Sequence, residues 1–183
     1  YAAARWSAFE EIFAWELWNE VNYAVDPKRV DLPGWSAEMA RWLSSWDPAG
    51  HPVTNSFGLD YIDPAYWKGA ELPITQVHAY IQDPAFARDA GHGDEVGWVL
   101  ETTRPLAALG RPFLLAEFGY SGTNDSHPLA DQDPDGLMFH NSIWATTFSG
   151  AAGSAMHWWW DNYIHPRGLT RHYQPLARTI SDV

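Results

Sequence analysis

The chain has 183 residues and a formal net charge of −12, from 11 basic and 23 acidic side chains. This length fits one domain, but a complete (β/α)8 barrel usually needs about 250 residues. Because the charge is acidic and no basic patch is visible, nucleic acid and anionic membranes are excluded as expected partners, whereas a neutral glycan is compatible. The absence of cysteine excludes disulfides, thiolate metal sites and a cysteine nucleophile.

Segments that direct a protein to or through a membrane are not expected within this chain. No apolar run reaches the roughly 18 residues of a membrane span. Residues 1–6 resemble the middle of a helix more than a signal peptide, so we expect the chain to begin inside an element. The 12 tryptophans can fill a core, but aromatic faces also stack on sugar rings. We expect an extracellular or periplasmic location, with any targeting signal in a part of the protein outside this chain.

Short apolar runs alternate with longer amphipathic stretches, and this alternation predicts βα units around a parallel sheet. The end of a helix over residues 1–8 precedes a first buried strand over 12–19. A helix over 35–46 follows, with Ser36 as its expected N-cap, and it leads to a second strand over 53–57.

The second half of the chain repeats the same alternation. A short helix over 63–68 precedes a strand over 74–80, and a helix over 94–109 is closed by Gly110. The remaining predicted elements are a strand over 112–118, a polar loop over 121–135, a helix over 137–149, a strand over 155–160 and a helix beginning at 173–180. We therefore expect one domain over residues 1–183 with five strands, each followed by a helix.

Two glutamates follow apolar runs where strands are expected to end, and active sites of parallel α/β folds form at the carboxyl ends of strands. The first strand ends in Trp18-Asn19-Glu20, which alone is also compatible with a helix cap or a loop salt bridge. Glu117 follows the apolar run 113–116. Because an unpartnered buried carboxylate is costly, Glu117 requires either a structural salt bridge or a catalytic role.

Two further strand ends carry polar or aromatic residues. His78 and Tyr80 are two residues apart and so face the same side of their strand. By the same rule Trp158 and Trp160 share one face of the last strand and Trp159 takes the other. One set can fill the layer between strands and helices, and the other can form the floor of a sugar subsite.

Taken in chain order, these motifs resemble a known family. Trp18-Asn19-Glu20, His78-Ala79-Tyr80, Glu117-Phe118-Gly119 and the Trp-rich last strand are similar to strands four, six, seven and eight of the family 5-like glycoside hydrolases of clan A. The resemblance implies an α/β fold, a partial (β/α)8 TIM barrel whose five βα units correspond to strands 4–8. Strands one to three, which supply an Arg and a His to the family's site, have no counterpart here.

The resemblance also implies a retaining mechanism with two carboxylates. It implies that Glu20 is the general acid and then the base, and that Glu117 is the nucleophile. The two roles need different surroundings, so we expect a less polar setting around Glu20 and hydrogen-bond donors around Glu117. Retention predicts carboxyl groups about 5–5.5 Å apart, whereas inversion needs about 6.5–9.5 Å.

The other expected site residues bind the substrate or hold the carboxylates. The resemblance implies that Tyr80 donates to Glu117, that Asn19 contacts the sugar 2-hydroxyl and that His78 lines the site near Glu20. Trp158 is expected to stack under the reacting sugar, with Trp160 as the second choice. No metal or organic cofactor is expected, because the histidine spacing matches no HExxH pattern. Both β-mannan and β-glucan are plausible substrates, and the loop 121–135 is where the choice is expected to lie.

Open sheet edges are the expected consequence of having five βα units. The edges of strands four and eight invite pairing with a missing N-terminal half or self-association, so we expect the isolated chain to have little glycosidase activity. The alternatives are a non-catalytic carbohydrate-binding barrel fragment, which would not need both glutamates, and a purely structural fragment, which leaves their placement unexplained. A Ser-His-Asp hydrolase is disfavoured because Ser154 lies outside any Gly-x-Ser-x-Gly motif.

Overall fold

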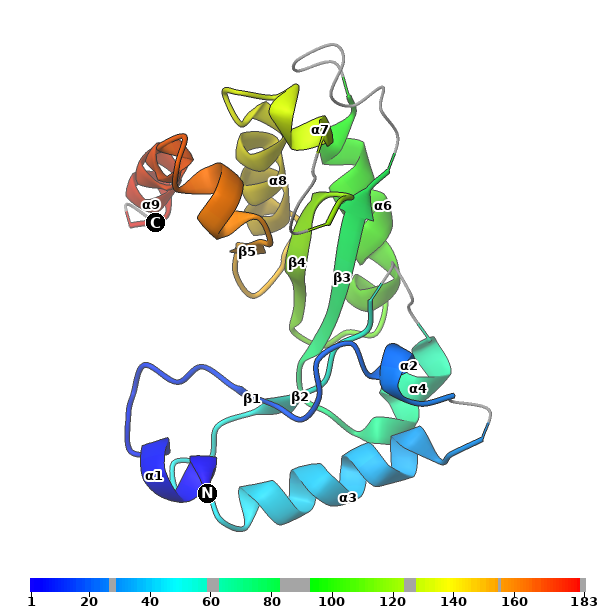
Figure 1. The fold of residues 1–183 in the computed structure, drawn as a ribbon. Coiled ribbons are helices and arrows are strands. Elements are labelled where there is room, and N and C mark those ends of the chain that lie inside the picture. The colour runs from blue at the N-terminus through cyan, green and yellow to red at the C-terminus, as the bar shows by residue number, and fades with distance from the viewer. Residues whose placement is uncertain (27–28, 59–62, 83–92, 124–127, 155, 182–183) are drawn as a thin grey trace. The chain divides into compact units, whose positions relative to one another are not determined.

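The structure is a computed structural model that describes residues 1–26, 29–58, 63–82, 93–123, 128–154 and 156–181. Its residues form two compact units, which are described separately. Unit 1 comprises Tyr1–His78 and Pro105–Leu114, and unit 2 comprises Ala79–Arg104 and Leu115–Val183. The chain passes from one unit to the other within the strands β3 (Thr75–Ile81) and β4 (Phe113–Tyr120), which Figure 1 labels.

Unit 1 begins with helical and strand segments that are short. Its elements in chain order are α1 (Ala2–Trp6), β1 (Trp15–Glu16), α2 (Val21–Ala24), α3 (Leu32–Ser44), β2 (Val53–Thr54), α4 (Pro64–Ala70) and the first part of β3. β1 and β2 pair in parallel, with Trp15 opposite Val53 and Glu16 opposite Thr54. Parallel pairing of consecutive strands across a helix is the expected βα arrangement.

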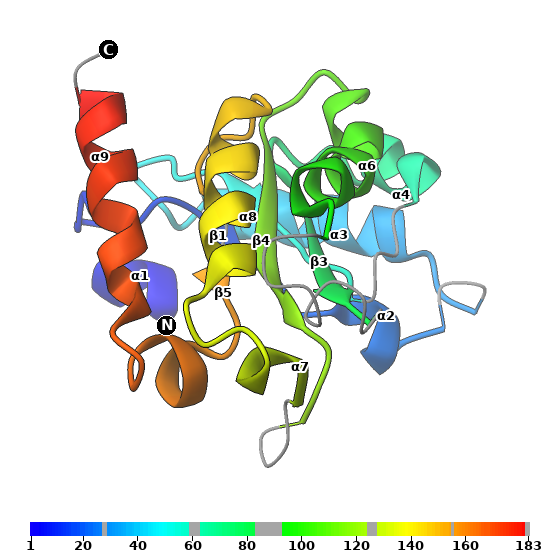
Figure 2. The ribbon, with the colours of Figure 1, turned by 90° about the horizontal axis from the view of Figure 1, so that it is seen from above.

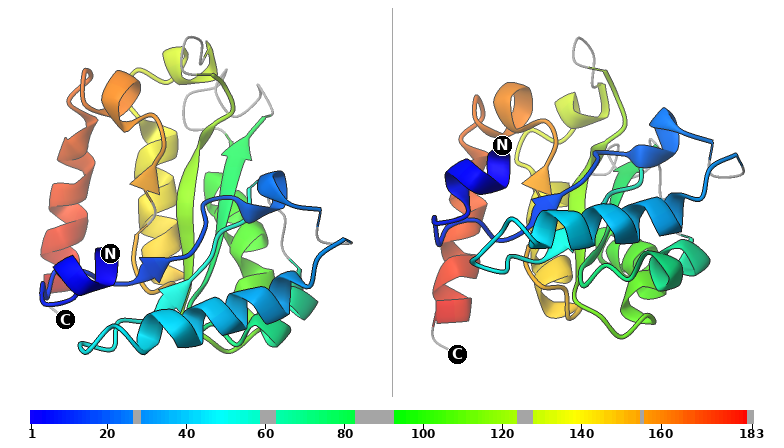
Figure 3. Two further views of the ribbon diagram at one scale, coloured as in Figure 1. Left: turned by 60° about the horizontal axis from the view of Figure 1, so that its bottom comes forward. Right: turned by 90° about the horizontal axis from the view of Figure 1, so that it is seen from below.

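Helix α3 begins earlier than the sequence pattern predicts, and its N-cap is Asp31 rather than Ser36. The Asp31 side chain accepts a hydrogen bond of 3.0 Å from the Gly34 N–H, and a proline in the first turn favours a helix start there. Ser36 lies inside the helix, buried, with its Oγ 2.8 Å from the Tyr66 hydroxyl of α4. Figure 3 shows α3 running alongside α4 and past β2.

The core of unit 1 is built on aromatic rings. Phe57 packs edge-on against Tyr66 and Trp67, with ring centroids 4.6 and 5.9 Å apart, and all three side chains are buried. Such contacts bury a large apolar area in a geometry that aromatic quadrupoles favour. The core therefore anchors residue 57, the middle residue of the segment 56–58.

A buried carboxylate fixes the turn between α3 and β2. Asp47 accepts hydrogen bonds from the Trp15 indole at 2.9 Å and from the His51 backbone N–H at 2.8 Å, and its Oδ2 is 2.9 Å from His51 Nδ1. Burial alone raises the pKa of Asp47, but the hydrogen bonds from Trp15 and His51 outweigh it and hold the pKa below its usual 3.8.

The lowered pKa of Asp47 leads to a pH-dependent stability. Because the folded state binds this proton less tightly than the unfolded state does, the contribution is complete above about pH 4 and is lost as the pH falls below it. We expect Asp47→Asn, which does not titrate, to reduce the loss of unfolding free energy between pH 6 and pH 3. Urea unfolding of both proteins at the two pH values measures this. Equal losses in the two proteins would assign the acid sensitivity to other groups.

Unit 2 contains most of a parallel sheet and the helices that cover it. Its elements after β3 are α6 (Glu95–Ala107, whose last residues belong to unit 1), β4, α7 (Pro128–Asp131), α8 (Leu137–Phe148), β5 (Met156–His157), η1 (Trp160–Ile164), η2 (Leu169–His172) and α9 (Tyr173–Ser181). The strand order is β3-β4-β5, and β4 pairs in parallel with β5.

Helices α6 and α8 lie on the same side of the sheet, as Figure 2 shows. The two helices are joined by a hydrogen bond of 3.1 Å from the Asn141 side chain to Glu95. Helix α8 meets the sheet through Phe139, which stacks on Phe118 of β4 with centroids 6.2 Å apart, and it meets α9 through the contact of Phe139 with Tyr173 at 5.1 Å. One layer of helices thus covers one face of the strands, as in a βα-built fold.

The start of α8 is organised by Asp133, which is buried. Its carboxylate accepts hydrogen bonds from the Leu137 and Met138 N–H groups at 2.9 and 3.0 Å and from the Tyr120 hydroxyl at 3.3 Å. Its backbone oxygen accepts a hydrogen bond of 2.6 Å from the Tyr163 hydroxyl. The anionic side chain thus satisfies donors at a helix N-terminus, where negative charge is favourable.

The predicted order of strands and helices is confirmed, but three of the five predicted strands are shorter in the structure. The strands predicted over 12–19, 53–57 and 155–160 reduce to β1, β2 and β5, each two residues long, and residue 155 lies outside the described residues. In the described part of the chain each of these strands pairs with one neighbour, over two residue pairs between β1 and β2 and two between β4 and β5, so the predicted runs extend beyond the residues that pair. None of the described helices has the length and apolar character needed to cross a bilayer.

Candidate functional site

Glu20, which lies between β1 and α2, has an unusual backbone conformation. It lies in the left-handed region, with φ 49° and ψ 54°, and it is the N-cap of α2, a position that normally has extended backbone. Among the residues that the structure describes, the other non-glycine residue with positive φ is Glu71, the C-cap of α4, where the left-handed conformation is common. For a residue other than glycine, such a backbone conformation costs about 1–3 kcal/mol, and it persists only where the surrounding structure fixes it.

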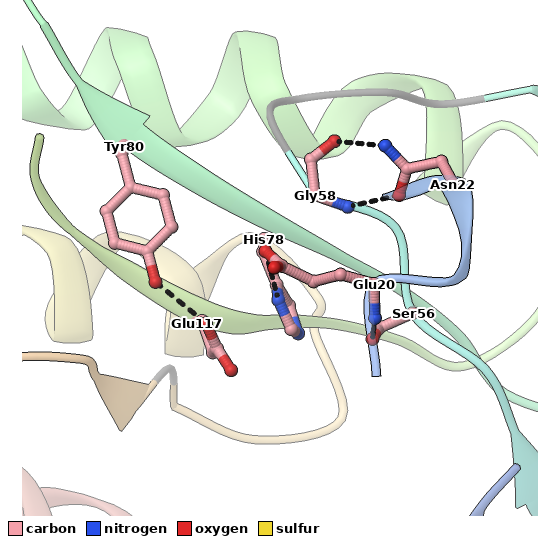
Figure 4. A network of polar contacts seen from close by, with 7 residues as sticks. All are labelled: Glu20, Asn22, Ser56, Gly58, His78, Tyr80 and Glu117. Atoms are coloured by element: carbon pink, nitrogen blue, oxygen red, sulfur yellow. Dashed lines mark hydrogen bonds and ion pairs between the residues drawn. The ribbon is translucent and has the colours of Figure 1, made fainter. Parts of the chain in front are cut away.

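The surroundings of Glu20 come from the segment 56–58, which is buried and follows β2. The Glu20 N–H donates to Ser56 Oγ at 2.8 Å, and the Val21 N–H donates to the Ser56 backbone oxygen at 3.0 Å. The carboxyl group lies over Gly58, where a Cβ atom would be 2.6 Å from Glu20 Oε1. Figure 4 shows this arrangement.

His78 of β3 is the side-chain partner of Glu20. Its Nδ1 is 3.1 Å from Glu20 Oε1, and its backbone N–H donates to the Phe57 oxygen at 2.9 Å. Burial lowers the pKa of His78 and outweighs the hydrogen bond and charge of Glu20, which raise it. The ring is therefore neutral near neutral pH, so Glu20 has a hydrogen-bonding partner that brings no fixed positive charge.

Glu117 lies in unit 2, inside β4 and opposite Met156 of β5. It is 8% exposed, and its Oε2 accepts a hydrogen bond of 2.7 Å from the Tyr80 hydroxyl, which Figure 4 also shows. The predicted hydrogen bond from Tyr80 to Glu117 is thus present. A short bond from a phenol to a carboxylate is charge-assisted and favours the ionised form.

Gly119 and the last strand complete the surroundings of Glu117. A Cβ atom on Gly119 would lie 3.3 Å from the His157 ring, so glycine allows that ring to pack closely against β4. The indole of Trp159 is buried and donates to the Tyr120 oxygen at 2.7 Å. Trp159 is therefore a packing residue of unit 2.

The remaining predicted site residues are exposed side chains. Asn19 is exposed beside Glu20, Trp158 is 38% exposed and Trp160 is 58% exposed. Trp158 and Trp160 do not share the face of one strand as predicted, because β5 ends at His157 and Trp160 begins the π-helical turn η1. Both rings still present surface to solvent, whereas the ring between them does not.

Three supporting residues were not predicted from the sequence. Ser56 accepts a hydrogen bond from the Glu20 N–H, and Gly58 leaves space for the Glu20 carboxyl group. Asn22 is joined to Gly58 by two hydrogen bonds. A serine near the end of a predicted strand and a glycine shortly after it are common in folded proteins, so neither residue carried a specific signal. Their importance depends on a contact between segments that are far apart in sequence.

Comparison with known proteins finds two plant relatives that are named as mannan endo-1,4-beta-mannosidases. No family model matches the sequence. The chain is 26% identical over 171 residues to the rice (Oryza sativa subsp. japonica) protein named "Putative mannan endo-1,4-beta-mannosidase 9", covering 81% of this chain and 41% of that protein. It is 24% identical over 172 residues to mannan endo-1,4-beta-mannosidase 4 of tomato (Solanum lycopersicum), covering 80% of this chain and 41% of that protein.

A solved structure shows the same fold. The glycoside hydrolase family 5 mannosidase from Rhizomucor miehei aligns with 80% of this chain and 39% of its own, with a TM-score of 0.53 and 17% identity. The chain thus has the α/β fold of part of that enzyme, and the resemblance to the family 5-like glycoside hydrolases of clan A is confirmed. The chain spans about two fifths of the length of the curated relatives it matches.

Proposed function

We propose that the protein containing this chain, a relative of the family 5-like glycoside hydrolases of clan A, hydrolyses the β-1,4 linkages of mannan with retention of configuration. The proposal assigns the general acid and base to Glu20 and the nucleophile to Glu117. The observation that carries it is the placement of one hydrogen-bonding ring beside each glutamate, both from the single strand β3. His78 lies against Glu20, and Tyr80 donates to Glu117.

The two surroundings suit two different roles. A carboxylate that attacks carbon must stay ionised while it is buried, and the Tyr80 hydroxyl supports this by donating a hydrogen bond at 2.7 Å. A carboxyl group that delivers a proton must be able to hold it, and a neutral His78 ring beside Glu20 does not oppose this with a positive charge. Paired carboxyl groups with unlike surroundings are the usual basis of acid and nucleophile assignments.

The proposed reaction has two displacements. In the first, a Glu117 oxygen attacks the anomeric carbon, the glycosidic bond breaks, and Glu20 gives its proton to the departing sugar oxygen. In the second, Glu20 removes a proton from water, whose oxygen attacks the same carbon and releases Glu117. Asn19 contacts the sugar 2-hydroxyl, and Trp158, with Trp160 second, offers an aromatic surface for stacking. Neither displacement requires a metal or an organic cofactor.

The proposed substrate also bears on where the protein acts. Mannan is the substrate that the names of both plant relatives give, so we propose β-mannan over β-glucan. A polysaccharide does not cross a membrane, so we propose that the protein acts outside the cytoplasm. Because the chain spans part of the relatives' length, the assays below use the full-length protein, in which we propose that further strands pair with the edges of β1 and β5.

An assay of substrate and stereochemistry tests the proposal. The full-length protein is incubated with β-1,4-mannan and, separately, with a soluble cellulose derivative, and the anomeric protons of the first products are followed by NMR. We expect hydrolysis of mannan, with the β-anomer appearing before mutarotation. Initial release of the α-anomer would contradict retention. Binding of mannan without turnover would contradict hydrolysis and favour the alternative of a non-catalytic carbohydrate-binding protein.

The Tyr80 hydroxyl provides a separate prediction. Tyr80→Phe removes the donor to Glu117 without changing the shape of the ring, so we expect kcat on mannan to fall by about 100-fold with KM little changed. Tyr66→Phe is the matched control, because it also removes a buried tyrosine hydroxyl, one that bonds Ser36 and Asn55. Steady-state kinetics and thermal unfolding of both variants separate a catalytic effect from a loss of stability.

A further inference from the structure

Helix α2, which begins directly after Glu20, is joined to the segment 56–58 by a second set of contacts that the reaction itself does not use. The Asn22 side chain accepts a hydrogen bond from the Gly58 N–H at 2.9 Å and donates one to the Gly58 oxygen at 3.3 Å. The amide of Asn22 thus occupies both polar backbone groups of one residue, as a neighbouring strand would. We call this pair of bonds the Asn22 bracket; it is drawn in Figure 4.

The Asn22 bracket and Ser56 hold the chain on both sides of Glu20. On one side the Ser56 hydroxyl accepts from the Glu20 N–H, and on the other Asn22 ties the first turn of α2 to Gly58. The segment 56–58 is in turn fixed to β3, because the His78 N–H donates to the Phe57 oxygen. A glutamate whose backbone is in the left-handed region needs such constraints, since an unconstrained glutamate backbone prefers other conformations.

Gly58 also leaves space for the Glu20 carboxyl group, because it has no side chain. Its α-carbon lies directly under the Glu20 carboxyl group, where a Cβ would be 2.6 Å from Glu20 Oε1 and 2.6 Å from the Tyr23 ring. The Glu20 carboxyl is the end of a flexible side chain, and Tyr23 is 57% exposed, so both can move if this space is filled. Alanine at residue 58 would therefore displace the carboxyl group from His78 without removing any bond of the bracket.

We propose that Asn22, Ser56 and Gly58 are positioning residues that hold the Glu20 carboxyl group against His78 in the orientation needed for proton transfer. The effect on proton transfer rests on the proposed function, whereas the placement of the Glu20 carboxyl group against His78 does not. Proton transfer requires placement within hydrogen-bond reach, and an error of about 1 Å is enough to lower a rate by about 100-fold.

The catalytic test uses leaving groups that differ in their need for a proton. Asn22→Ala and Gly58→Ala are made in the full-length protein and assayed on mannan and on a 2,4-dinitrophenyl β-mannobioside, whose phenolate departs without protonation. Because kcat/KM reports the first displacement, we expect it to fall by about 10- to 100-fold on mannan and to stay within about threefold of wild type on the dinitrophenyl substrate. Equal losses on the two substrates would overturn the inference.

A matched control separates positioning from stability. Ser36→Ala removes a buried hydrogen bond of 2.8 Å to Tyr66 in the same unit, away from Glu20. We expect this variant to keep the wild-type ratio of the two kcat/KM values whatever its stability. Asn22→Asp retains the acceptor for the Gly58 N–H and loses the donor, so it should recover part of the mannan activity lost in Asn22→Ala. Failure of this partial recovery, with all variants folded, would also count against the bracket.

A readout that needs no activity completes the test. The His78 ring is titrated by proton NMR in the wild type, Glu20→Gln, Asn22→Ala and Gly58→Ala proteins. Glu20 raises the pKa of His78 against the effect of burial, so displacing the carboxyl should lower that pKa in both positioning variants, as in Glu20→Gln. An unchanged His78 titration in Asn22→Ala and Gly58→Ala would refute positioning. If mannan is not hydrolysed even by the wild type, the proposed function fails and this titration still decides the inference.

Discussion

Replacing Glu117 with alanine in the full-length protein is expected to lower kcat on mannan by about 10⁴- to 10⁶-fold, the range found when a covalent nucleophile is removed. The physical reason is that no glycosyl-enzyme intermediate can form, so water must displace the leaving group in one step. Added azide should restore turnover of a dinitrophenyl mannobioside by entering the space left by the side chain. The product should be the α-glycosyl azide, because one displacement inverts the anomeric carbon.

The same reagent distinguishes the two glutamates. In Glu20→Ala the nucleophile remains, so azide should attack the glycosyl-enzyme and give the β-glycosyl azide after two displacements. Glu101→Ala is the matched control, since Glu101 is an exposed glutamate on α6, and we expect it to retain wild-type rates. If both active-site variants give the same anomer, or if Glu101→Ala loses as much activity as they do, the assignment of roles is wrong.

Replacing Asp133 with alanine is expected to lower the free energy of unfolding by about 3–5 kcal/mol. The carboxylate satisfies the Leu137 and Met138 N–H groups and the Tyr120 hydroxyl, and alanine leaves these donors without it. Each buried donor left unsatisfied costs about 1–3 kcal/mol, and two of these donors are the first N–H groups of α8. Thermal or urea unfolding of the purified variant measures the difference.

A neighbouring aspartate provides the control for Asp133. Asp131 makes an ion pair of 2.8 Å with Arg167, and its side chain is 67% exposed. An exposed ion pair of this kind contributes about 0–1 kcal/mol, so Asp131→Ala should change stability little. Equal destabilisation by the two variants would show that the loop, rather than the buried carboxylate, determines the stability of this part of unit 2.

The sequence pattern predicted the order of the strands and helices, and the family resemblance implied the pairing of Tyr80 with Glu117. The strands predicted over 74–80 and 112–118 correspond to β3 and β4, because long apolar runs bounded by turn residues are informative on their own. His78 and Tyr80 could be assigned to one face of a strand from their spacing alone. Each ring then contacts one glutamate within the same unit.

The details that the sequence did not provide depend on long-range contacts. The N-cap of α3 is Asp31, because a proline and Gly34 favour an earlier start than the periodic residues indicate. The short β1 and β5 reflect how few of their residues pair with a neighbouring strand, two in each case, which no local pattern reports. The Asn22 bracket likewise joins residues 36 positions apart. The predicted separation of the two carboxyl groups stays a prediction.

The central claim is that Glu117 attacks the anomeric carbon, and covalent trapping tests it most directly. The full-length protein is treated with a 2-deoxy-2-fluoro β-mannobiosyl donor that carries a good leaving group, so that the fluorine slows release of the intermediate. Peptide mass spectrometry should then find the sugar on the peptide that contains Glu117, and none on that peptide in Glu117→Gln. A sugar attached to Glu20 or to any other side chain, or rapid turnover with release of the α-anomer and no labelled peptide, would contradict the account.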